Sequence, residues 1–224
     1  MIQDRLQSIL SSIPNGVQLV AVSKTKPLED ILEVYEAGQR IFGENKVQEL
    51  VEKHETLPKD IQWHYIGHLQ RNKVKYIAPF VSLIHGVDSE RLLREIDKEA
   101  AKNQRVIECL LQIHIADEST KFGLTPGESK DLLSSDILNE LPNVKIVGLM
   151  GMATYTEDEA QISREFSMLG QLLNELKTTF YSSDNSFQIL SMGMSGDYQI
   201  AIQNGSNMIR VGSSIFGERN YPAK

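Results

Sequence analysis

The chain has 224 residues, of which 41% are hydrophobic and 24% charged, as in ordinary soluble globular proteins. Its formal net charge of −7 disfavours non-specific binding to nucleic acid or to an anionic membrane surface. A single cysteine, Cys109, leaves no intrachain disulfide, and no apolar run approaches the ~20 residues of a membrane span, so we expect a cytoplasmic protein.

In chain order, the first predicted element is a helix over residues 2–13, where Leu6 and Ile9 recur at helical spacing before Pro14. A strand follows over 17–22, an almost continuous apolar run of the kind found in strands buried on both faces. The same alternation then continues along the chain. Further strands are predicted at residues 40–42, 62–65, 81–85, 106–115, 144–149, 188–190 and 208–210, with helices at 27–38, 45–54, 70–77, 89–103, 126–140, 158–180 and 196–204.

Strands that alternate with helices in this way favour a closed parallel barrel, an α/β fold of the (β/α)8 TIM-barrel type with an extra N-terminal helix. An open doubly wound sheet is the alternative, but no glycine-rich dinucleotide motif follows the first strand. No linker, low-complexity tract or long charge run divides the chain. We therefore expect residues 1–224 to form a single domain.

The lysines after the first strand are candidates for chemistry, because the active site of such a barrel lies at the carboxyl ends of its strands. Burial lowers the pKa of a lysine and frees its neutral amine to form a Schiff base with an aldehyde. Lys24 is closer to the strand than Lys26, which we expect at the rim beside Pro27. An ion-paired structural lysine is the competing interpretation.

Two further strand ends carry polar residues. Asn45 follows the second strand and either caps the next helix or faces the mouth of the barrel. His64 and His68 are four residues apart but lie on the third strand and its loop, where this spacing separates them. Because no acidic or cysteine partner completes a ligand set, we expect no metal site.

The loops after the seventh and eighth strands, residues 191–196 (SMGMSG) and 212–214 (GSS), are rich in glycine and serine. Barrels commonly hold a phosphate in these two loops, although glycine and serine also fill ordinary turns. Arg210, at the end of the eighth strand, must pair with a neighbouring carboxylate or face a ligand. A lysine, an arginine and a phosphate site at one barrel mouth suit a phosphorylated aldehyde, and pyridoxal 5′-phosphate is the obvious one.

Several long motifs stand in an order that is characteristic of one family. They are AVSKTKP (21–27), FGEN (42–45), VQE (47–49), WHYIG (63–67), LQ (69–70), NK (72–73), GLM (148–150), LSMGMSGD (190–197) and RVGSSIFG (210–217). Together they closely resemble the pyridoxal phosphate homeostasis proteins, over about residues 17–219. The resemblance implies a barrel like the N-terminal domain of alanine racemase.

The resemblance also implies roles for individual residues. Lys24 would carry the cofactor as an aldimine, and Arg210 would face the pyridine nitrogen. The other implied contacts are the phosphate ligands Ser195, Gly212, Ser213 and the backbone of Met194, and the ring neighbours Asn45 and Ser191. Two positions depart from the usual pattern, with Lys46 in place of tyrosine and His68 where proline is frequent. We expect both of them outside the cofactor cup.

Two interpretations of such a site compete, a cofactor carrier and a racemase-like enzyme. An arginine beside the pyridine nitrogen disfavours its protonation and so weakens the ring as an electron sink. Racemisation also needs an acid and a base on opposite faces of the substrate. In alanine racemases the second group is a tyrosine on an extra β domain of the partner subunit, and nothing in the sequence places Tyr155, Tyr198 or Tyr221 in that role.

We therefore expect a protein that carries and buffers pyridoxal phosphate without turnover, and not an enzyme. Its expected partners are the cofactor and the apo-enzymes that depend on it, and we expect a monomer, with a weak dimer as the alternative. A Schiff-base aldolase acting on sugar phosphates is a third interpretation. It predicts no visible cofactor absorbance, whereas both pyridoxal interpretations predict a yellow protein.

Overall fold

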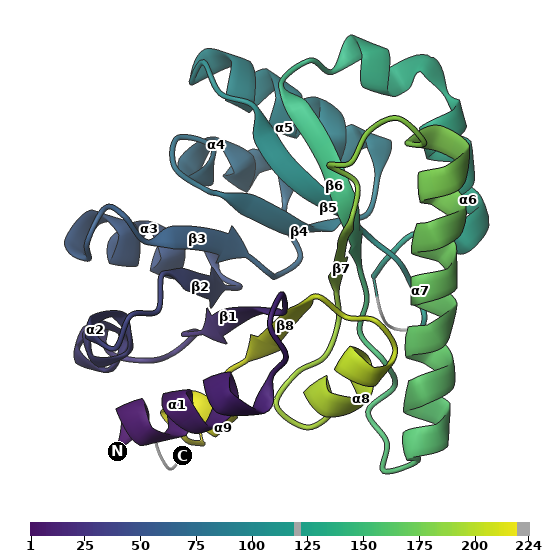
Figure 1. Cartoon of the computed structure of the whole chain (residues 1–224). Helices are drawn as coiled ribbons and strands as arrows, with labels where there is room; N and C mark the ends of the chain where they lie inside the picture. Colours follow the sequence, from purple (N-terminus) through teal and green to yellow (C-terminus); the bar gives the residue numbers. More distant parts are fainter. Residues whose placement is uncertain (119–121, 219–224) are drawn as a thin grey trace.

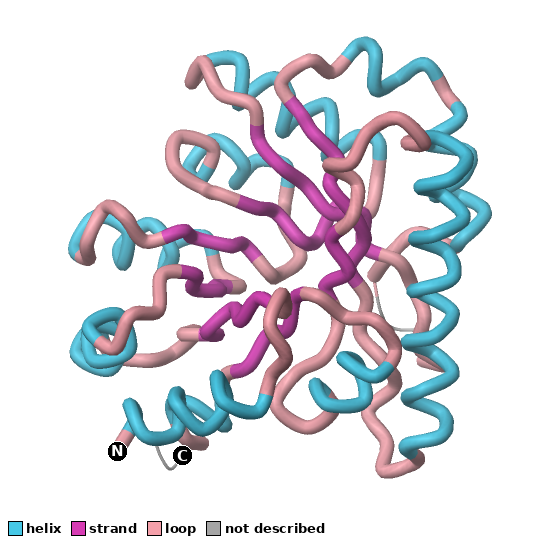
Figure 2. The backbone as a smooth tube through the Cα atoms, viewed as in Figure 1, coloured by secondary structure: helices cyan, strands magenta, loops and turns pink. Residues whose placement is uncertain are grey.

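The structure, a computed structural model, describes residues 1–118 and 122–218. In this part of the chain, parallel strands close into a barrel in their sequence order, with β8 paired to β1 (Figures 1 and 2). The strands are β1 (Gln18–Val22), β2 (Ile41–Glu44), β3 (Gln62–Tyr65), β4 (Leu83–Val87), β5 (Ile107–Gln112), β6 (Val144–Met150), β7 (Ile189–Ser191) and β8 (Met208–Val211).

Helices surround the barrel and connect successive strands (Figure 1). They are α1 (Ile2–Ser12), α2 (Leu28–Glu36), α3 (Val47–Thr56), η1 (Arg71–Lys73), α4 (Val74–Ile77), α5 (Glu90–Lys102), α6 (Pro126–Ser134), η2 (Asp136–Glu140), α7 (Glu159–Phe180), α8 (Tyr198–Gln203) and α9 (Ser213–Phe216), where η marks a 3-10 helix. The predicted (β/α)8 TIM barrel with an extra N-terminal helix is therefore confirmed. None of these helices has the length and apolar character of a membrane span.

Apolar side chains fill two layers, which explains why the strands read as continuous apolar runs. One cluster comes from five of the strands and consists of Val20, Leu83, Leu110, Val147, Met150 and Met208. A larger cluster joins the outer face of the strands to the helices, and Phe42, Trp63 and Phe166 are fully buried within it. Close packing on both faces fixes the strand ends, and with them the loops that form the mouth.

The N-terminal helix covers a gap in the ring of helices. The helix after β8, α9, has only four residues. α1 packs beside α9 (Figure 1), and Arg5 Nε donates a hydrogen bond of 2.6 Å to the carbonyl of Ile215. Leu6 and Ile9 are the buried residues of α1. The extra helix therefore shields the side of the barrel that so short a helix cannot cover.

Several predicted boundaries were wrong. The helix predicted over 126–140 ends at Ser134, because Ser135 adopts an extended backbone before η2 begins. The strand predicted over 106–115 ends at Gln112, where the next loop folds back and Ile113 bridges Leu124. The helix predicted from residue 45 begins two residues later. In each case a local turn overrides the hydrophobic pattern.

Candidate functional site

A cavity of about 650 Å³ opens at the carboxyl ends of the strands, within the usual size range of ligand pockets. Seven of the eight predicted site residues line it: Lys24, Asn45, Met194, Ser195, Arg210, Gly212 and Ser213. They come from the ends of β1, β2, β7 and β8. The eighth, Ser191, is fully buried at the end of β7 and contacts Arg210. The structure therefore brings the whole predicted set together.

Lys24 lies in a turn after β1 and not within the strand. The N–H of Lys26 donates to the carbonyl of Ser23 over 3.0 Å, which closes the turn. The Lys24 side chain is half-buried and lines the cavity. Lys26 also lines it, but its Nζ donates to three carbonyls at the end of α9, those of Phe216, Gly217 and Glu218. The Nζ of Lys26 is therefore held at the end of α9.

Arg210 is a buried cation at the cavity wall. Its Nη1 donates to Ser191 Oγ over 2.6 Å and its Nη2 to the carbonyl of Gly151 over 3.1 Å. Burial lowers the pKa of Arg210 to about 10, so the guanidinium remains charged at neutral pH. Both of these hydrogen-bond partners are neutral oxygens, and the nearby Asp197 carboxylate, whose charge raises the pKa of Arg210, lines the same cavity.

Two histidines extend the hydrogen-bond chain behind Arg210. His85 Nδ1 lies 3.0 Å from Ser191 Oγ, and His85 Nε2 lies 3.1 Å from His64 Nδ1. Burial lowers the pKa of His64 to about 3, and burial together with the nearby His64 and Arg210 holds the pKa of His85 well below its usual value. Both rings are therefore neutral, and the chain orients the Ser191 hydroxyl without adding charge.

The glycine- and serine-rich loops meet at one side of the cavity. The N–H of Gly212 donates to Ser195 Oγ over 3.2 Å, and Ser213 begins α9 beside them. Gly193 has a φ of +95°, and a Cβ there would lie 2.6 Å from the Cβ of Ala201, so only glycine fits. The loops thus bring the Ser195 and Ser213 hydroxyls to the cavity, where hydroxyls can donate to a phosphate, while the Gly212 N–H is bonded to Ser195 Oγ in this structure.

Asp197 is a cavity residue that the sequence analysis missed. Its Oδ1 accepts a hydrogen bond of 2.6 Å from the N–H of Met194, the backbone group expected to hold phosphate. That N–H is therefore committed to a carboxylate in this structure. Other lining residues that were not predicted as site residues include Ile66, Gln112, Met152 and Phe122.

The loop after β2 decides between the two interpretations of Asn45, and the loop after β3 corrects the expectation for His68. Lys46, and not Asn45, is the N-cap residue of α3, and the Asn45 carbonyl accepts a hydrogen bond of 3.0 Å from the Tyr65 hydroxyl. Asn45 therefore faces the mouth. His68 was expected outside the cup but lines the cavity, because the same Tyr65 hydroxyl also donates to the His68 carbonyl and draws the loop over the mouth.

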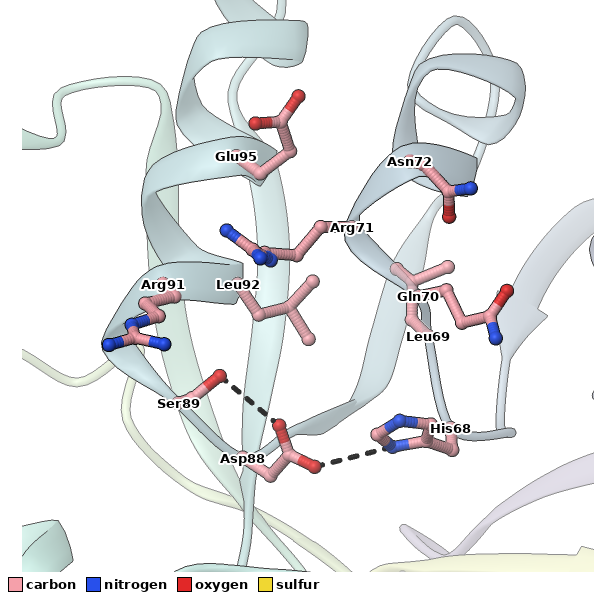
Figure 3. A pocket seen from close by; sticks show the side chains of 10 residues that line it. All are labelled: His68, Leu69, Gln70, Arg71, Asn72, Asp88, Ser89, Arg91, Leu92 and Glu95. Carbon is pink, nitrogen blue, oxygen red and sulfur yellow. Dashed lines mark hydrogen bonds and ion pairs between the residues drawn. The ribbon is translucent and has the colours of Figure 1, made fainter.

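A second, open hollow of about 700 Å³ lies on the other side of His68 (Figure 3). His68 Nδ1 lies 3.3 Å from Asp88 Oδ2, and its ring stacks on Phe122 at a centroid distance of 4.0 Å. Arg71 and Arg91 project from the two sides of this hollow (Figure 3). No predicted site residue lines it, so the deeper cavity is the candidate site.

The structure places two of the three tyrosines that the racemase interpretation considered. Tyr155 lines the cavity but its side chain is 98% exposed. The hydroxyl of Tyr198 lies 3.2 Å from Ser12 Oγ on α1, away from the mouth. Tyr221 lies outside the described residues. Among the residues that the structure describes, no group of three or more His, Cys, Asp or Glu side chains could hold a metal ion.

Comparison with known proteins identifies the family. The family described as "Alanine racemase, N-terminal domain" matches residues 1–220. A pyridoxal phosphate homeostasis protein of Aquifex aeolicus is 41% identical over 208 residues, which are 92% of this chain and 89% of that protein.

Solved structures agree with this assignment. PipY of Synechococcus elongatus is 36% identical and covers 97% of this chain and 100% of its own; its TM-score is 0.91 without PLP and 0.87 with PLP bound. The chain therefore belongs to the family of pyridoxal phosphate homeostasis proteins, whose barrel is that of the alanine racemase N-terminal domain.

Proposed function

We propose that the chain binds pyridoxal 5′-phosphate in this cavity and carries or buffers it for vitamin B6 and amino-acid homeostasis, without turning over a substrate. The observation that carries the proposal is the arrangement of Lys24, Arg210 and the two glycine- and serine-rich loops around one cavity. The related PipY has been solved with PLP bound. The whole chain, residues 1–224, would act as one cofactor-binding domain.

The residues present fit this cofactor. A primary amine at Lys24 matches its aldehyde, and a buried guanidinium at Arg210 matches a pyridine nitrogen that accepts a hydrogen bond. Hydroxyls of Ser195 and Ser213 and the N–H of Gly212 suit its phosphate. Among the described residues that line the cavity, Asp197 is the one acidic residue, so its carboxylate would be displaced from the phosphate or would limit the affinity.

The same residues favour a carrier over an enzyme. When bound, pyridoxal phosphate supplies an aldehyde that reacts with amines and a ring that can accept electrons. Arg210 keeps its proton at neutral pH because its pKa is about 10, so it donates to the ring nitrogen and does not protonate it. The weakened electron sink disfavours racemisation. Tyr155 is too exposed to be held as an acid or base opposite Lys24.

The remaining expectations are also part of the proposal. The relatives are named for pyridoxal phosphate homeostasis, which fits delivery of the cofactor to apo-enzymes. We propose a monomer that acts in the cytoplasm and binds neither nucleic acid nor membrane, consistent with its net charge of −7.

Absorbance titration tests the proposal. Added pyridoxal phosphate should turn the protein yellow, and Lys24→Ala should abolish the band of the covalently held cofactor. Lys26→Ala is the matched control and should retain that band. A colourless protein that takes up no cofactor would contradict the proposal and would leave the aldolase interpretation. Steady amino-acid racemisation that Lys24→Ala abolishes would instead favour the enzyme.

A further inference from the structure

The turn that carries Lys24 is a strained one. Lys24 and Thr25 are its two central residues, and Thr25 has a φ of +63°. This conformation belongs to glycine, asparagine or aspartate in most turns, and it is unfavourable for a β-branched residue such as threonine. The turn therefore needs stabilising contacts from outside.

Helix α3 supplies these contacts on both sides of Lys24. Lys53 Nζ donates to the carbonyl of Ser23 over 2.8 Å, and the N–H of Thr25 donates to Glu49 Oε1 over 2.6 Å. The residues that precede and follow Lys24 are thus both held through their backbone. Glu49 and Lys53 lie four residues apart on α3 and bond to each other over 2.6 Å.

The contacts form a network that is buried at Glu44 and Lys53 and reaches the surface at Glu49, whose side chain is 22% exposed. Lys53 has three N–H donors, and they meet three acceptors: the Ser23 carbonyl, Glu49 Oε1 and, over 2.7 Å, Glu44 Oε1. Ser23 Oγ donates to the same Glu44 oxygen over 2.6 Å. The side chain of Lys53 is 5% exposed and that of Glu44 is fully buried. Apolar residues could fill this space without the desolvation cost of buried charges, so the network points to a positional role.

We propose that Glu49 and Lys53 are positioning residues that clamp the Ser23–Lys26 turn in its strained conformation, so that the Lys24 amine is presented to the cavity. They line no part of the cavity and would act only through Lys24. The inference rests on the proposed function, because it assumes that Lys24 is the point of attachment.

The test compares Glu49→Ala in two backgrounds. In the otherwise unchanged protein it should weaken pyridoxal phosphate binding by roughly tenfold or more, since a charge-assisted hydrogen bond to the turn is lost. In the Lys24→Ala protein, where the cofactor is held only by its phosphate and ring contacts, the same substitution should leave the affinity unchanged. A general structural role would weaken binding in both backgrounds. Glu52→Ala, at an exposed position of α3, is the matched control and should change neither affinity.

Two further variants test the clamp, and the first of them remains informative if Glu49→Ala folds poorly. Glu49→Gln retains an acceptor oxygen for the Thr25 N–H and should keep most of the covalent uptake. Thr25→Gly removes the conformational cost of the positive φ at this position. Glu49→Ala should therefore weaken pyridoxal phosphate binding less in a Thr25→Gly protein than in the unchanged protein.

If Glu49→Ala weakens cofactor binding equally with Lys24 present and in the Lys24→Ala protein, or in neither, the clamp is overturned. Uptake at Lys24 by the unchanged protein is scored separately by borohydride reduction. Failure of that uptake contradicts the proposed function, whereas uptake that is insensitive to Glu49 contradicts the clamp alone.

Discussion

At the residue scale, Arg210 is a buried cation whose hydrogen bonds go to neutral groups and whose pKa is lowered by burial and raised by the Asp197 carboxylate. Its guanidinium bonds to Ser191 and to the Gly151 carbonyl, and Ser191 is in turn oriented by His85. The buried charge is therefore available to a ligand that accepts a hydrogen bond. A substitution at Arg210 should therefore weaken the contact with the pyridine ring while leaving the covalent bond at Lys24 able to form.

Arg210→Gln should weaken cofactor binding by about 10- to 100-fold, because a hydrogen bond from a charged group is worth about 1.5–3 kcal/mol. The covalent linkage at Lys24 should still form at high cofactor concentration, with a shifted absorbance maximum. Titration followed by absorbance measures both effects. Unchanged affinity and spectrum would mean that Arg210 does not face the ring.

The sequence alone pointed to most of these residues. Lys24, Ser195 and Arg210 all follow or end apolar strands, and the carboxyl ends of barrel strands meet at one mouth. Asp197 and His85 could not be predicted in the same way. Asp197 acts through a turn contact with Met194, and His85 meets Ser191 across the barrel, 106 positions along the chain. Such contacts depend on loop conformation and on strand register.

At the scale of elements, β3 and β4 bury two neutral histidines side by side. Unfolded histidine has a pKa near 6.5, and burial lowers the folded pKa of His64 to about 3. The unfolded chain therefore binds more protons between these values. The stability that neutral His64 contributes is present above pH 6.5 and is lost as the pH falls toward 3.

Lowering the pH from 7 to 5 should reduce the free energy of unfolding by about 2 kcal/mol through His64, with a further loss of the same sign through His85. Urea unfolding at several pH values between 7 and 5 measures how the free energy of unfolding depends on pH. His64→Gln should flatten this pH dependence, whereas substitution of the half-buried His54, whose pKa burial also lowers, should change it less. A slope that His64→Gln leaves unchanged would show that this histidine does not titrate as described.

Helix α1 should be needed for stability because it covers the side of the barrel that the four-residue α9 leaves open. Leu6 is fully buried in that contact. Leu6→Ala should lower the free energy of unfolding by about 2–5 kcal/mol, the usual cost of such a cavity. Gln7→Ala, on the exposed face of α1, should change it by less than about 0.5 kcal/mol. Equal effects of the two substitutions in denaturant unfolding would contradict the packing.

Element type was more predictable than element length. The α/β alternation identified each strand, because the barrel buries both strand faces and so imposes apolar runs. The boundaries at Ser135 and Gln112 depend on local backbone turns that the hydrophobic pattern does not encode. The role of α1 was likewise hidden, since it depends on how short the last helix is.

At the scale of the whole molecule, a barrel with its mouth open to solvent suits exchange of a cofactor. The mouth is bordered by exposed side chains, including Tyr155 and the half-exposed Met194. Assays with amino acids should therefore show no sustained racemisation by the cofactor-loaded protein. Turnover that persists in the Tyr155→Phe variant but disappears with Lys24→Ala would contradict the carrier role and assign the base to Lys24 itself.

Borohydride reduction of the cofactor-loaded protein, followed by peptide mapping, examines the site most directly. Reduction fixes the cofactor to the amine that holds it, so the mass label reports the attachment point. We expect one label per chain, on the peptide that contains Lys24, and none on Lys26. A label on another side chain, or a protein that acquires none, would contradict the account of this cavity.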